Sequence, residues 1–153
     1  MDFFKGLADN QVLISALVGW TVAQLLKTII DLILNRSFSA ERLVGSGGMP
    51  SSHSATVCGL TTAAGLVYGV SSFEFAISFV LASVVMYDAM GVRREAGKQA
   101  KLLNMILEQD SFRLTNEAFQ QRLKELIGHT PLQVLAGAAL GIALAFAVDG
   151  CYA

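Results

Sequence analysis

Charge is scarce in this chain of 153 residues. Asp, Glu, Lys and Arg make up 15% of it, against 54% hydrophobic residues, whereas about a quarter of a soluble domain is charged. The net charge is -1, and no basic stripe with interleaved aromatic residues is present, which excludes a nucleic-acid partner. The lack of charge and the long uncharged runs predict an integral membrane protein.

Cysteine, histidine and proline are also rare, with two residues of each. Cys58 and Cys151 stand in no CxxC or Cys/His pattern, so we expect ordinary thiols and no zinc site. No Asp/Glu cluster suited to magnesium is apparent, and no cofactor is expected. The N-terminus lacks the basic start and the small-residue cleavage pattern of a signal peptide, so we expect it to remain as part of the first membrane helix.

Four apolar segments approach the length of about 20 residues that a membrane-spanning helix needs. The second and fourth are rich in glycine and alanine, which let helix backbones approach closely in lipid. The length of the chain fits one domain, residues 1–153. The four segments are residues 12–34, 54–70, 73–92 and 130–148.

A polar stretch, residues 92–128, separates the third and fourth segments. Within it, Phe112, Phe119, Leu123 and Leu126 fall near one face of a helix. We therefore predict an amphipathic helical insert on the membrane surface. The expected fold is an all-α integral membrane bundle of about four transmembrane helices with this cytoplasmic insert.

Basic residues predict the topology. They gather in the loop over residues 35–50 and in the stretch after the third helix, and none lies in the turn between the second and third helices. With four spans, the two basic loops share one side, which the positive-inside rule makes cytoplasmic. We expect a multi-pass protein of the cell membrane with both termini outside.

The same count of four spans places the polar residues together at one cytoplasmic rim. Both histidines, His53 and His129, begin helices there, and Lys27 lies late in the first helix, toward the same side. The segment GGMPSSHSA, residues 47–55, adds glycines before a helix start, where free N–H groups and the helix dipole favour an anion. Two imidazoles beside a phosphate suit phosphoryl transfer, one as nucleophile and one as acid.

These residues carry a resemblance. Pro50-Ser51-Ser52-His53 is similar to the P-S-G-H motif of the type 2 phosphatidic acid phosphatase family, relatives of the vanadium haloperoxidases. With YDAMGVRREAGKQA and LKELIGHTP, it resembles the divergent bacterial and plant branch of that family. The resemblance covers most of the chain.

The resemblance implies a role for each residue of the rim. His129 would be the nucleophile that becomes phosphorylated, and His53 the general acid. Ser51 and the backbone at Ser52 would hold phosphate oxygens. Lys27 would match the lysine of the family's first motif. Arg94, or its neighbour Arg93, would match the arginine of the family's S-R motif.

The sequence departs from the family pattern at several positions. Gln133 stands where the family has the aspartate that orients the nucleophile, so Asp88 or Asp31 is a candidate substitute. The family's first motif is incomplete, because no arginine stands seven residues after Lys27. Arg36 and Arg42 are the candidates for the role of that arginine.

Two functions follow as hypotheses. The first is a metal-independent membrane phosphatase that hydrolyses a lipid phosphate or pyrophosphate through phosphohistidine. The second is a catalytically degenerate protein that binds anionic lipid head groups or scaffolds a partner. A small transporter is disfavoured because no inverted repeat is visible. The sequence leaves open the substrate and whether the chain forms a homo-oligomer.

Overall fold

The protein is described by a computed structural model, which describes residues 3–35, 48–108 and 128–152. The elements within these ranges are all α-helices, in agreement with the predicted all-α fold. The helices are α1 (Phe3–Ala8), α2 (Gln11–Asn35), α3 (Ser52–Tyr68), α4 (Phe73–Met90), α5 (Val92–Glu108) and α6 (Pro131–Tyr152).

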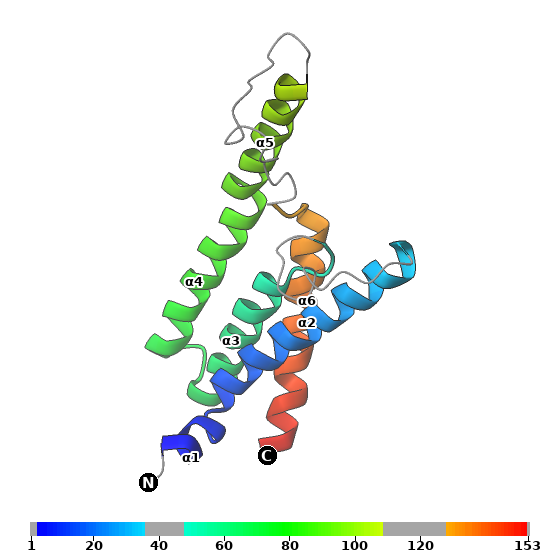
Figure 1. The fold of residues 1–153 in the computed structure, drawn as a ribbon. Helices are drawn as coiled ribbons and strands as arrows, with labels where there is room; N and C mark the ends of the chain where they lie inside the picture. The colour runs from blue at the N-terminus through cyan, green and yellow to red at the C-terminus, as the bar shows by residue number, and fades with distance from the viewer. Residues whose placement is uncertain (1–2, 36–47, 109–127, 153) are drawn as a thin grey trace.

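The four long helices of the bundle alternate in direction, as Figure 1 shows. α2 and α4 end at the side where α3 and α6 begin, and this side of the bundle is called the rim below. Both chain termini lie at the opposite end (Figure 1). The alternating directions of these four helices bring the starts of α3 and α6 together at one end (Figure 1).

Within the described residues, three stretches are long and apolar enough to cross a bilayer, namely Gln11–Leu34, Phe73–Ile106 and Pro131–Tyr152. α3 is shorter, and its 17 residues rise by about 26 Å. It nevertheless occupies the centre of the bundle, where it packs against α2, α4 and α6. The predicted membrane bundle is therefore confirmed, with its shortest helix innermost.

Glycine allows α3 and α6 to touch backbone to backbone. A Cβ atom at Gly137 would clash with the main-chain carbonyl of Ser51, and one at Gly141 would clash with that of Ala55. These two glycines stand four residues apart on α6, the spacing that lets membrane helices approach closely. Their contact sets the distance between the two helix starts at the rim.

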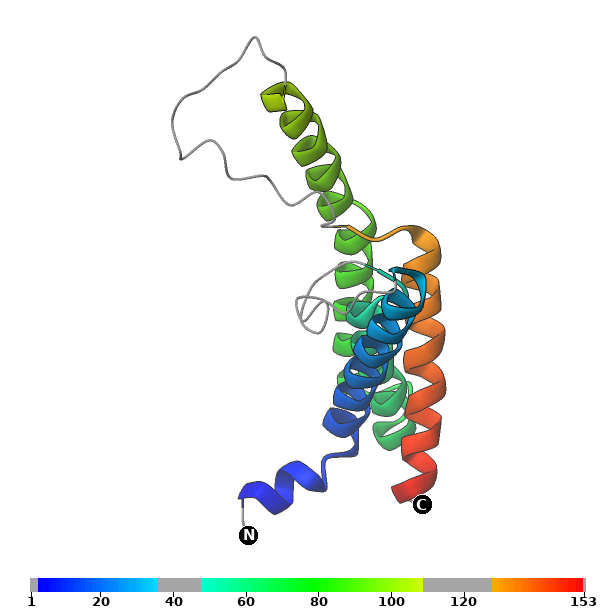
Figure 2. The ribbon, with the colours of Figure 1, turned by 45° about the vertical axis from the view of Figure 1, so that its right-hand side comes forward.

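α5 continues beyond α4 after a break at Gly91 and projects past the rim (Figures 1 and 2). It forms the first part of the predicted insert, and its apolar and polar residues separate onto different faces. The residues that motivated the amphipathic prediction, between 112 and 126, lie outside the described residues. At the opposite end of the bundle, α1 turns away from the axis of α2 (Figure 2).

Candidate functional site

The two histidines of the chain face each other at the rim. The ring centroids of His53 and His129 are 6.1 Å apart, and the ring planes meet at 60°. His53 lies in the first turn of α3, and His129 lies two residues before α6. Residues 76 positions apart in the sequence thus form one pair, because the two helices start side by side.

Gln133 holds the ring of His129. Its Oε1 atom lies 3.3 Å from Nδ1 of His129 and accepts a hydrogen bond from the main-chain N–H of Thr130 at 3.0 Å. An amide oxygen only accepts, so Nδ1 of His129 carries the proton in this contact. The lone pair is then on Nε2, the nitrogen that is free to attack an electrophile.

The segment before α6 is anchored on α4. The main-chain N–H of His129 donates to the carbonyl of Ala89 at 3.0 Å, one of the carbonyls that the end of α4 leaves without an intrahelical partner. Gly128 packs directly on the main chain of Arg94, where a Cβ atom would clash. The position of His129 is therefore fixed by both α4 and α5, and His129 itself is buried.

Ser51 caps α3 and joins it to α6. Its Oγ accepts from the N–H of Ser54 at 3.3 Å and from the hydroxyl of Ser54 at 3.1 Å, while its own N–H donates to the carbonyl of Gln133 at 3.1 Å. Ser51 is fully buried. The N–H groups of Ser52 and His53 follow at the helix start, where α3 itself offers no acceptor.

Two cations, Lys27 and Arg93, and the carboxylate of Asp88 lie near the histidine pair. Lys27 of α2 is 3% exposed, and its aliphatic chain packs on Gly48, 3.0 Å from an ideal Cβ position there. Arg93 pairs with Asp88, Nε to Oδ2 at 2.6 Å. Lys27, Arg93 and Asp88 all lie within electrostatic range of His53.

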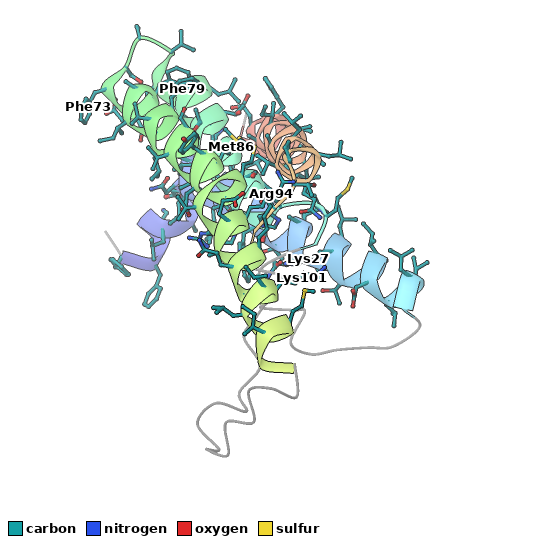
Figure 3. The ribbon with its side chains drawn as sticks, turned by 90° about the horizontal axis from the view of Figure 1, so that it is seen from above. Lys27, Phe73, Phe79, Met86, Arg94 and Lys101 are labelled. Atoms are coloured by element: carbon teal, nitrogen blue, oxygen red, sulfur yellow. The ribbon has the colours of Figure 1, made fainter. Side chains whose placement is uncertain are left out.

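Arg93 and Arg94 are placed differently. The charge of Arg93 acts on both His53 and His129, whereas Arg94 contacts the loop before α6 through its main chain. Figure 3, which views the bundle from the rim, shows Lys27 on α2 and Arg94 on α5 around this end. Of the two arginines that the sequence left as alternatives, Arg93 carries a charge that lies near both histidines.

Burial lowers the pKa of His129 below its ordinary value of 6.5, and the positive charges of Lys27 and Arg93 lower it further, although the hydrogen bond with Gln133 opposes them. The neutral imidazole is the reactive form of a nucleophilic histidine. The surroundings of His129 thus keep it neutral at neutral pH.

Metal ligands do not gather among the described residues: no three side chains of His, Cys, Asp and Glu lie together in residues 3–35, 48–108 and 128–152. Arg36 and its alternative Arg42 lie outside these ranges. The sequence gives no signal for the roles of Thr130 and Ala89, because both act through the main chain. It gives none for Ser54 either, because the hydroxyl of Ser54 is one that any helix start could use. Only the capping of α3 had a signal, the repeated serines at its start.

Comparison with known proteins identifies the family. A sequence profile described as the divergent PAP2 family matches residues 8–144. The chain is also 40% identical over 148 residues to a protein named uncharacterized membrane protein YuiD, from Bacillus subtilis (strain 168), with 90% of this chain and 93% of that protein covered. No solved structure matches the chain. The chain belongs to the divergent PAP2 family.

Proposed function

We propose that this member of the divergent PAP2 family is a membrane phosphatase that hydrolyses a lipid phosphate or pyrophosphate through a phosphohistidine. The observation that carries the proposal is the histidine pair, with rings 6.1 Å apart and His129 held by Gln133. Gln133 leaves Nε2 of His129 with its lone pair, and His53 stands on the facing helix start. Family membership supports the same chemistry.

The first half of the reaction forms a covalent intermediate. Nε2 of His129 attacks phosphorus, a P–N bond forms, and the P–O bond to the lipid alcohol or phosphate breaks. His53, in its protonated form, gives a proton to the leaving oxygen. Lys27, Arg93 and the N–H groups at the start of α3 stabilise the charge on the other phosphate oxygens.

The second half returns the enzyme to its starting state. Neutral His53 now takes a proton from water, and the water oxygen attacks the phosphorus of phospho-His129. The P–N bond breaks, inorganic phosphate leaves, and His53 is protonated again. No step requires a metal ion, because the two histidines and the positive charges supply the nucleophile, the proton and the charge stabilisation.

A lipid substrate is supported by the place of the pair. The rim belongs to a bundle of apolar helices, and large hydrophobic side chains are exposed along α2, α4 and α6 where lipid would surround them. A lipid phosphate reaches such a site by lateral diffusion, with its head group at the rim. We expect both histidines to act from the cytoplasmic side, following the basic loops.

The test is phosphate release from a panel of lipid phosphates and pyrophosphates by detergent-purified protein with EDTA present. His129→Ala should abolish release, and acid-labile phosphate should be trapped on the wild type and be absent from His129→Ala. His53→Ala should slow release by roughly a hundredfold or more. Arg94→Gln, a change of charge at the same end, serves as the matched control.

Absence of release from every lipid, with anionic lipid still bound at the rim, would overturn the phosphatase. It would favour the catalytically degenerate lipid-binding protein, in which Gln133 replaces the carboxylate of an active site. Release that survives in His129→Ala would instead show that another residue attacks phosphorus.

A further inference from the structure

A groove runs along the membrane face of α3, between α2 and α4. α2 packs on α3 and α6 but not on α4, so within the described helices α3 forms the floor between two separated walls. The groove has a volume of about 380 Å³. Leu13, Leu60, Ile77 and Leu81 provide apolar lining, and Glu74 lies at its far end. It lies away from the rim, in a part of the bundle that the phosphatase chemistry does not use.

The groove and the rim nevertheless share helix faces. On α3, Leu60 follows His53 by seven residues, a spacing that returns to the same face of a helix. On α4, Leu81 precedes Asp88 by the same interval. On α2, Leu13 lies two such intervals before Lys27. Each of the three helices therefore presents a polar rim residue and an apolar groove residue in one line.

The depth of the groove can be read from the same helices. At 1.5 Å per residue, Leu60 lies about 10 Å from His53 along α3, and Tyr68, another lining residue, lies about 22 Å away. The hydrocarbon core of a bilayer is about 30 Å thick, so its midplane is about 15 Å from the surface. The groove therefore begins within the leaflet next to the rim and continues past the midplane.

The size of the groove limits its occupant. A volume of about 380 Å³ holds roughly a dozen groups the size of a water molecule, at about 30 Å³ each, and a methylene is of similar size. A transmembrane helix is about 10 Å wide and would not fit such a space. One hydrocarbon chain would fit, and its apolar surface matches the lining.

We propose that the groove between α2, α3 and α4 binds the distal part of a single hydrocarbon chain that is longer than one leaflet, on the lipid whose phosphate lies at His53 and His129. The substrate class is then a single-chain lipid phosphate or pyrophosphate of polyprenyl length. A diacyl lipid is disfavoured because its chains end near the midplane and leave the far half of the groove empty. This inference rests on the proposed phosphatase function.

The experiment compares three substrates in nanodiscs: a long polyprenyl phosphate, farnesyl phosphate and dioleoyl phosphatidic acid. Wild type should prefer the polyprenyl phosphate. Ile77→Trp fills the far half of the groove and should lower kcat/KM for the polyprenyl phosphate about tenfold while farnesyl phosphate is hydrolysed as before. Val80→Trp is the matched control, because Val80 lies on the same helix, does not line the groove and is 60% exposed against 56% for Ile77.

Several outcomes would overturn the inference. Equal losses in Ile77→Trp and Val80→Trp, parallel losses with farnesyl phosphate, or a wild-type preference for either shorter substrate would each do so. If wild type hydrolyses none of the three and none of the lipid pyrophosphates of the panel above, the phosphatase proposal fails and the groove is judged by labelling. A polyprenyl phosphate with a diazirine at the end of its chain should label α3 or α4 in wild type and in Val80→Trp, and not in Ile77→Trp. Absence of that labelling in wild type overturns the groove as a chain site.

Discussion

The main-chain N–H of Ser51 donates to the main-chain carbonyl of Gln133 at 3.1 Å. This bond joins the residue that caps α3 to the residue that orients His129. The start of α3 carries His53, so a single backbone contact ties both members of the histidine pair to one another. The geometry of the pair consequently depends on how closely α3 and α6 can approach.

Replacing Gly137 by alanine should disturb that approach. The added Cβ atom would clash with the carbonyl of Ser51, and overpacking of this kind costs about 1–3 kcal/mol. We expect a lower midpoint of thermal unfolding in detergent and reduced phosphatase activity. Gly150→Ala is the control on the same helix, because nothing lies within 4 Å of a Cβ atom there. Equal midpoints for the two variants would contradict the close contact.

The pH dependence of His129 follows from its surroundings. Its pKa lies below 6.5 because it is buried and because Lys27 and Arg93 lie nearby. The nucleophilic neutral form should therefore persist as the pH falls past 6.5 and be lost only when the pH drops through the lowered pKa. Since the chain has only two histidines, NMR titration of isotope-labelled histidine can follow each ring, with His53→Gln as the assignment control. A His129 pKa at or above 6.5 would refute the prediction.

Gln133→Glu tests the departure from the family pattern. Glutamate keeps the length of glutamine and places a carboxylate beside Nδ1 of His129, which should raise the pKa of His129 by about one unit or more. It should also raise turnover, since a carboxylate stabilises the imidazolium that forms during the reaction.

Two companion variants control for the length and the polarity of that side chain. Gln133→Asp is shorter by one methylene and should gain less, and Gln133→Leu should reduce turnover because it leaves Nδ1 without its acceptor. A fall in turnover with Gln133→Glu would mean that the site depends on the neutral amide, whose oxygen also accepts from Thr130.

The two neighbouring arginines should differ in their effect on substrate binding. Arg93→Gln removes a charge that acts on both histidines, so KM for a lipid phosphate should rise about tenfold, the effect of losing one hydrogen bond to a charged group. Arg94→Gln should leave KM nearly unchanged because its main chain makes the contact with Gly128. Kinetics of both purified variants decide between them. A larger effect of Arg94→Gln would reverse the assignment.

Much of the fold follows from hydropathy alone. The predicted span 12–34 matches α2, residues Gln11–Asn35, and the predicted span 130–148 matches α6, residues Pro131–Tyr152, because an apolar run in a membrane has few alternatives to a helix. The second predicted span, 54–70, begins two residues later than α3 does. Its true start, Ser52, is fixed by the cap on Ser51, whose hydroxyl bonds to Ser54.

The site was less completely predictable. The number of apolar segments predicts that His53 and His129 lie at the same end of the bundle. It does not predict the distance between their rings, because that distance depends on the contacts of Gly137 and Gly141 with α3. The choice between Arg93 and Arg94 depends on the break at Gly91 that turns α5 relative to α4. Such a break changes the direction of every side chain after it, and nothing in the spacing of the arginines encodes the angle.

The shortness of α3 also makes bilayer thickness a variable of the reaction. A helix of 17 residues is about 26 Å long, shorter than a typical hydrocarbon core of about 30 Å. Its two ends, one of which carries His53, cannot both reach the level of the surrounding head groups unless the bilayer thins around the protein. We therefore expect turnover to rise in thin bilayers and fall in thick ones, so that the lipid environment sets the rate as well as supplying the substrate.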